Sequence, residues 1–201
     1  MKQFILNTCM KSIKNTCPEY NEQRLLEIRY GLESLYLSVT KCIIIFICAL
    51  ILGILKEMFI ILLLYTMLRT FGYGLHATKS WICLVSSLIV FIVVPLTCIH
   101  FIIPIYIKII LCSLCVICFY LYAPSDTKRH PLIKKKKRMM LKCITVCISI
   151  VFTFLCLQIE NNFLSNAFLF AMIIETILIC PLTYKLFNLP YNNYKYYLAN
   201  N

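Results

Sequence analysis

Long apolar runs alternate with short polar segments along the whole chain. The runs CIIIFICALILGIL and WICLVSSLIVFIVVPLTCI carry no charged residue, and FIIPIYIKIILCSLCVICFYLYA carries a single lysine. A bilayer-spanning helix needs roughly 20 such residues, and a backbone in hydrocarbon must satisfy its own hydrogen bonds. The pattern therefore predicts an all-α integral membrane protein. Because the runs are continuous rather than alternating, a β-barrel is not expected.

Six hydrophobic helical segments are predicted, at residues 43–55, 58–68, 81–99, 101–122, 141–157 and 163–184. Together they define a membrane domain over residues 41–184, with a polar loop at 69–83 and a basic loop at 124–142. Lys56 and Glu57 are expected to mark a tight turn between the first two segments. The aromatic and polar tail, residues 185–201, is suited to the membrane interface.

An amphipathic interfacial segment, residues 1–40, is predicted to precede the membrane domain. Residues 1–17 are polar and are expected to be loosely ordered. Over residues 19–41, apolar positions recur at helical spacing between charged ones, which predicts an amphipathic helix. Such a helix anchors a chain at the membrane surface. The alternative is that its charged face binds a substrate peptide.

Composition and charge refine this picture. Hydrophobic residues make up 61% of the chain, against roughly 45–50% in soluble domains. The net charge of +12 is therefore not expected to bind nucleic acid, because the sequence predicts no soluble domain that could present it. Eighteen of the twenty Lys and Arg residues lie on one side of the predicted spans, the exceptions being Lys56 and the intramembrane Lys108. The positive-inside rule then places both termini and the 69–83 loop in the cytoplasm of a multi-pass cell-membrane protein. The basic loop is expected to face anionic lipid.

Most of the thirteen cysteines lie within apolar runs, where a thiol behaves as a small hydrophobic group. Cys112, Cys115 and Cys118 are closely spaced but lack a His or acidic partner, so no metal site is expected there. So many thiols also argue against an oxidising compartment for the loops that carry them.

The segment RTFGYGLHATKSWIC, which begins at Arg69, places an imidazole near a thiol. A thiolate is a nucleophile, and a neighbouring imidazole accepts its proton. On one continuous helix, the seven-residue spacing of His76 and Cys83 would separate them by roughly 10 Å, too far for a hydrogen bond. A catalytic pair therefore requires a bend, which Gly72 and Gly74 permit. The alternative is an interfacial histidine beside an ordinary cysteine.

Several motifs occur in one order along the chain: IRYGLESL, Arg69, GLHA, Cys83, FIVVPL and YAPSDTKRHPLIKKKKR. This ordered set resembles the accessory gene regulator protein B (AgrB-like) family of membrane cysteine endopeptidases. The resemblance implies cleavage of an amphipathic AgrD-like precursor peptide near its C-terminus, through an acyl-thioester that an internal Cys or Ser then converts to a thiolactone or lactone. It also implies a homodimer. Leu75 departs from the small residue that the family often carries before HA.

Carried onto this sequence, the resemblance makes Cys83 the nucleophile and His76 the base, with Arg69 supporting the pocket. No cofactor is implied. Ser80, Thr78 and backbone N–H groups are candidate oxyanion donors.

The residue that orients His76 is left open between Glu33, Asp126 and Glu175. Glu175 is the one acid within an apolar run, which makes it a functional candidate or a packing partner for a buried Ser or Lys. The basic cluster consists of Lys134, Lys135, Lys136, Lys137 and Arg138. In one interpretation it only sets the membrane topology, and in the other it also attracts the acidic tail of the precursor.

Two other functions compete with the endopeptidase. A non-enzymatic peptide exporter or channel fits the apolar composition, but no internal repeat supports a transporter. A zinc enzyme using His76 and Cys83 lacks a third ligand at a familiar spacing.

Overall fold

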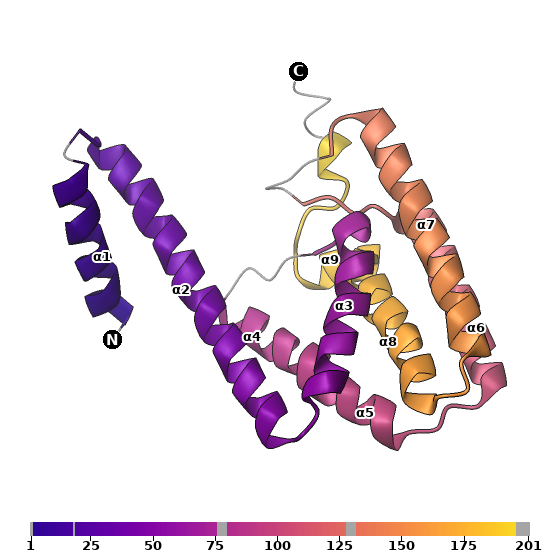
Figure 1. The fold of residues 1–201 in the computed structure, drawn as a ribbon. Coiled ribbons are helices and arrows are strands. Elements are labelled where there is room, and N and C mark those ends of the chain that lie inside the picture. Colours follow the sequence, from indigo (N-terminus) through magenta and orange to yellow (C-terminus); the bar gives the residue numbers. More distant parts are fainter. Residues whose placement is uncertain (1, 18, 76–79, 128–131, 196–201) are drawn as a thin grey trace. The chain divides into compact units, whose positions relative to one another are not determined.

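The computed structural model describes residues 2–17, 19–75, 80–127 and 132–195. Figure 1 shows its helices, which are α1 (Lys2–Thr16), α2 (Glu22–Ile51), α3 (Leu55–Gly72), α4 (Ser80–Leu88), the π-helix η1 (Ile89–Val93), α5 (Val94–His100), α6 (Ile105–Tyr122), α7 (Lys135–Gln158), α8 (Asn162–Ile179) and α9 (Pro181–Leu186). They confirm the predicted all-α membrane fold.

Five helical segments in the described part of the chain are long and apolar enough to cross a membrane: α2, the continuous rod α4–η1–α5, α6, α7 and α8. The remaining predicted segment, the second one at residues 58–68, is α3, which is a helix of 18 residues. It is not among the five because it carries three charged residues within its length, Lys56 and Glu57 in its first turn and Arg69 in its last.

The chain divides into two compact units, Met1–Cys48 and Ala49–Asn201. In the first unit, residues 2–16 form the helix α1, so the expectation of a loosely ordered segment is wrong. The amphipathic helix and the first span are one helix, α2, because residues 32–52 contain no glycine or proline to separate them. The side chain of Asn21 accepts a hydrogen bond from the N–H of Arg24 and so caps the start of α2.

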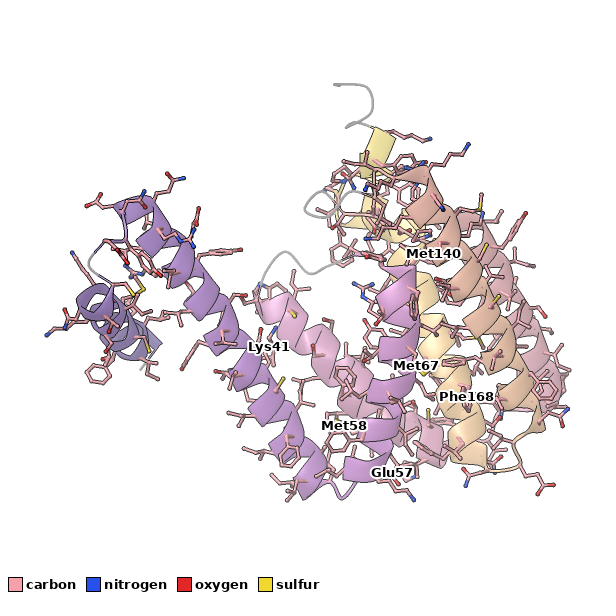
Figure 2. The ribbon with its side chains drawn as sticks, turned by 45° about the horizontal axis from the view of Figure 1, so that its top comes forward. Lys41, Glu57, Met58, Met67, Met140 and Phe168 are labelled. Atoms are coloured by element: carbon pink, nitrogen blue, oxygen red, sulfur yellow. The ribbon has the colours of Figure 1, made fainter. Side chains whose placement is uncertain are left out.

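In the second unit, α8 is the central helix and contacts α3, α5, α6 and α7 (Figure 1). It buries residues on several of its faces, among them Phe168, Leu169 and Met172. Phe168, which is labelled in Figure 2, lies on α8. Its ring meets that of Phe152 of α7 edge-on, with the ring centroids 5.0 Å apart. The buried Lys108 of α6 donates a 2.6 Å hydrogen bond to the Ser165 hydroxyl of α8. Among the spans of the second unit that are apolar enough to cross a membrane, α8 is the least hydrophobic, and it is the one that the other helices cover.

Glycine and prolines set the ends of the helices. The turn before α3 is made at Gly53, with φ +68°, so Lys56 and Glu57 lie inside the helix rather than in the turn (Figure 2 labels Glu57). Pro104 delays the start of α6, and Pro181 ends α8 and opens α9, because the residue before a proline avoids helical angles. Pro95, the second residue of α5, lacks the N–H of a regular helix, and the wide turn η1 ends two residues before it.

The basic cluster is helical rather than part of a loop. Lys134 is the N-cap of α7, and residues 135–138 form the first turn. The membrane helix therefore begins within the run of positive charge.

Candidate functional site

The backbone just after α3 is held between two other parts of the second unit. The N–H of Gly74 donates to the carbonyl of Ser125 at 2.8 Å, and the N–H of Ser125 donates to the carbonyl of Gly72 at 3.1 Å. The N–H of Leu75 donates to the carbonyl of Leu178, near the end of α8, at 3.0 Å. These bonds fix the chain immediately before the position of the predicted base, although α3, the loop after α6 and α8 are distant in sequence.

Arg69 holds the same segment from the other side. Its guanidinium donates to the carbonyl oxygens of Tyr73, Gly74 and Leu75. It also faces the carboxylate of Glu175 on α8, with Nη1 3.6 Å from Oε2. The side chain of Arg69 is 16% exposed and that of Glu175 is fully buried. We call Arg69, Glu175, Ser125 and Leu178 the loop clamp, because together they hold residues 72–75.

The two glycines are required for different reasons. A Cβ atom at Gly72, which lies in α3, would come within 2.7 Å of Oε1 of Glu175. A Cβ atom at Gly74 would lie 2.6 Å from Nη1 of Arg69 and 2.9 Å from the Leu178 carbonyl oxygen, and its φ of +96° already favours glycine. The prediction that both glycines permit unusual backbone angles therefore holds for Gly74, whereas Gly72 makes room for a buried carboxylate.

Cys83 lies in the first turn of α4 and is partly exposed. Its carbonyl oxygen accepts hydrogen bonds from the hydroxyls of Ser86 and Ser87, and Ser80 is the first residue of the same helix. His76 and Thr78 lie outside the described residues. The contact between the imidazole and the thiol therefore stays a prediction, as does the part of Thr78 in an oxyanion hole.

Tyr65 is a residue of this region that sequence analysis missed. It lies one helical turn before Arg69 on α3. Its ring meets Phe91 of η1 edge-on, with centroids 6.1 Å apart. Tyr65 thus links α3, which carries Arg69, to the continuous rod α4–η1–α5, which carries Cys83. The four-residue spacing from Arg69 was the one available signal.

Asp126 follows Ser125 and is buried. Its carboxylate accepts hydrogen bonds from the N–H groups of Asn193 at 2.8 Å, Tyr194 at 2.7 Å and Leu132 at 3.4 Å. We call Asp126, Asn193 and Tyr194 the C-terminal anchor. The contacts bind the end of the chain to the loop after α6, and a part for Asp126 in orienting His76 stays a prediction.

Two tyrosines close this region around Asp126. The hydroxyl of Tyr184 donates to the Asp126 carbonyl at 3.2 Å, and its ring meets Tyr191 edge-on with centroids 5.2 Å apart. Burial raises the pKa of both Tyr184 and Tyr191 above the ordinary value for tyrosine. Both hydroxyls therefore remain neutral hydrogen-bonding groups at physiological pH.

The remaining predicted residues lie elsewhere. Glu33 is on α2, in the first unit. Lys134 to Lys137 are exposed at the start of α7. Arg138 differs from these lysines, since its guanidinium lies 3.7 Å from the Tyr194 ring centroid and donates to the Leu132 carbonyl.

No metal site is formed by the residues that the structure describes, since no three His, Cys, Asp or Glu side chains gather there as ligands. Cys112 and Cys115 of the closely spaced cysteine series are packed in the core of the second unit.

The fold and the clamp together define a multi-pass helical membrane protein that braces a segment between its second and third hydrophobic helices. A family model described as Accessory gene regulator B matches residues 6–179. The chain belongs to the accessory gene regulator B family, which takes part in the processing of quorum-sensing peptides. This confirms the resemblance found in the sequence motifs.

Relatives match over most of their own length. An AgrB-like protein of Listeria monocytogenes serotype 4a is 32% identical, over 88% of this chain and 87% of its own. An AgrB-like protein of Listeria innocua is 33% identical, with the same shares covered. Protein FsrB of Enterococcus faecalis is 25% identical over 91% of this chain and 76% of its own. No solved structure gives a significant match.

Proposed function

We propose that this protein is a membrane cysteine endopeptidase that removes the C-terminal tail of an AgrD-like quorum-sensing precursor peptide. Cys83 is the nucleophile and His76 the base. The observation that carries the proposal is the loop clamp, which braces the backbone directly before residue 76, seven residues ahead of a partly exposed cysteine. Membership of the accessory gene regulator B family supports the same reaction.

The reaction proceeds by two acyl transfers. The imidazole of His76 takes the thiol proton of Cys83, and the thiolate adds to the scissile carbonyl of the precursor. The oxyanion that forms accepts hydrogen bonds from Ser80, Thr78 or backbone N–H groups at the start of α4. When the C–N bond breaks, the imidazolium returns its proton to the leaving amine. The tail departs, and the rest of the peptide stays on Cys83 as a thioester.

The second transfer closes the ring. An internal Cys or Ser of the bound peptide loses its proton to His76 and attacks the thioester carbonyl. A thiolactone or lactone forms, and the Cys83 thiolate recovers the proton. Because a thioester keeps much of the acyl-transfer potential of the peptide bond, the step needs no nucleotide, provided that water is excluded. A pocket at membrane level supplies that exclusion.

The proposal includes an orientation and partners. Both termini and the 69–83 loop face the cytoplasm, as the positive-inside rule indicates. The basic cluster lies against anionic lipid and attracts the acidic tail of the precursor, and the protein acts as a homodimer.

Co-expression with a precursor tests this function. The precursor to use is a short amphipathic peptide with an internal Cys or Ser and an acidic tail, encoded beside this protein's gene. We expect wild type to release the tail, seen by mass spectrometry, and Cys83→Ala and His76→Ala to release none. Cys83→Ser measures how far a weaker nucleophile can substitute. Cys42→Ala, which removes an exposed cysteine of α2, is the matched control and keeps activity.

Two inhibitors separate this enzyme from its rivals. A thiol alkylator should stop tail release, whereas a chelator should leave it unchanged and so exclude the zinc enzyme. Tail release that persists in Cys83→Ala would instead favour the exporter or channel, with another protease as the source of cleavage.

A further inference from the structure

Glu175 is a buried carboxylate that faces the guanidinium of Arg69, its one close charge among the described residues. Among the described residues, neither of its oxygens accepts a hydrogen bond, and the guanidinium lies 3.6 Å away. Removing a carboxylate from water is costly unless the charge is paired. The presence of an acid in the apolar run of α8 therefore needs a physical reason. The ion pair with Arg69 is not sufficient, because a buried pair adds little net stability.

The reason lies in the second set of contacts that Arg69 makes. Its guanidinium donates to three consecutive carbonyl oxygens, those of Tyr73, Gly74 and Leu75. Because a peptide unit is planar, holding the Leu75 carbonyl restrains the direction in which the chain leaves Leu75. The next residue in sequence is the proposed base. Arg69 thus works on the backbone rather than on a reacting atom.

The space around the pair is shaped for this arrangement. Gly72 leaves room for the Glu175 carboxylate, and Gly74 leaves room for the Arg69 guanidinium. A methyl group at either position would meet a polar atom of the pair at 2.6–2.7 Å. Two of the four glycines in the chain therefore accommodate these two side chains.

We propose that Glu175 is a positioning residue, which acts on the Cys83–His76 reaction only through Arg69. The carboxylate holds the guanidinium in the orientation that binds the three carbonyls, and the carbonyls set the approach to His76. This inference rests on the proposed function. It differs from the simpler idea that Glu175 orients the imidazole by direct contact, and it assigns Glu175 no contact with the peptide substrate.

A double-mutant cycle distinguishes the two roles. Arg69→Gln, Glu175→Gln and the double variant are purified in proteoliposomes, and cleavage of the synthetic precursor is followed by release of its tail. Misplacing a catalytic group by about 1 Å costs roughly 100-fold in rate. We expect Glu175→Gln to lower kcat by about that factor while KM stays unchanged. The double variant should lose no more than Arg69→Gln alone, because Glu175 has nothing left to act through.

Exchanging the two charges provides a second test. In the variant Arg69→Glu/Glu175→Arg, an ion pair is possible, but a carboxylate at position 69 cannot donate to the carbonyls. Activity should therefore stay as low as in Arg69→Gln. Glu160→Gln, which removes an exposed carboxylate just before α8, is the matched control and should change kcat by no more than about twofold, as for a surface substitution.

Each outcome decides one question. A wild type that does not cleave refutes the proposed function. If wild type cleaves, the positioning role is overturned by a Glu175→Gln enzyme of normal kcat, by additive losses in the double variant, or by recovery in the charge-exchanged one. The alkylation rate of Cys83 by iodoacetamide, read by mass spectrometry, adds a measurement that needs no peptide. It should fall in Glu175→Gln as it does in His76→Ala.

Discussion

At the scale of single residues, Arg69 is the point where the contacts of the site converge. It joins Glu175 of α8 to three backbone carbonyls after α3. In the sequence, Arg69 is a candidate because it belongs to a motif, and Glu175 is one because acids are rare in spans. Their pairing was not predictable, since more than a hundred residues separate them and no local pattern records a contact at that distance.

Gly72 tests how closely the clamp is packed. Gly72→Ala should displace the Glu175 carboxylate and lower the tail-release rate at least tenfold, an estimate that follows from roughly 100-fold per 1 Å of misplacement. The matched substitution is Gly31→Ala, in a helix and with no atom within 4 Å of the new Cβ. Thermal unfolding in detergent should show Gly31→Ala to be as stable as wild type or more stable, by up to about 1 kcal/mol. A fully active Gly72→Ala enzyme would show that the carboxylate position is unimportant.

At the scale of helices, sequence periodicity predicted the elements well and their ends less well. The apolar runs located every span, but the union of the amphipathic helix with the first span in α2 depends on the absence of a helix breaker. Conversely, Pro104 and Pro181 shorten α6 and α8 within runs that remain apolar on both sides. Hydrophobicity sets where a chain enters lipid, whereas backbone chemistry sets where a helix starts and stops.

The first turn of α7 carries a prediction about substrate binding. Lys134 to Lys137 are exposed, whereas Arg138 is engaged with Tyr194 and Leu132. Changing the four lysines to Gln should raise KM for a precursor with an acidic tail and leave kcat unchanged, because the charges attract the substrate without taking part in the chemistry. Cleavage kinetics at several salt concentrations measure this effect. A KM equal to that of wild type would limit the cluster to its topological role.

At the scale of the whole second unit, contacts between distant segments complete the site. Ser125 pairs with the loop after α3, and the next residue, Asp126, binds the backbone of Asn193 and Tyr194. The sequence marked Asp126 as a candidate because it is the one aspartate. That it receives backbone N–H groups from the tail could not be read from composition, since any segment can supply such donors.

The C-terminal anchor should therefore affect the candidate site at a distance. A chain that ends at residue 190 lacks the Asn193 and Tyr194 donors to Asp126 and keeps only that of Leu132 among the described contacts. Leaving a buried acceptor unsatisfied costs about 1–3 kcal/mol. We expect a lower unfolding temperature in detergent and slower tail release. A chain that ends at residue 195 keeps both donors and serves as the control. Equal stability of the two truncated proteins would show that the anchor does not support the fold.

The order of synthesis gives the Arg69–Glu175 pair a further consequence. The ribosome makes Cys83, the proposed nucleophile, early, but Glu175 emerges only with the last long helix. Until that helix has inserted and packed, Arg69 lacks the Glu175 carboxylate and the N–H of Leu75 lacks the Leu178 carbonyl, so the loop clamp is incomplete. An incomplete chain in the membrane is then expected to be inactive, and the proposed proteolytic activity would arise only after α8 has packed.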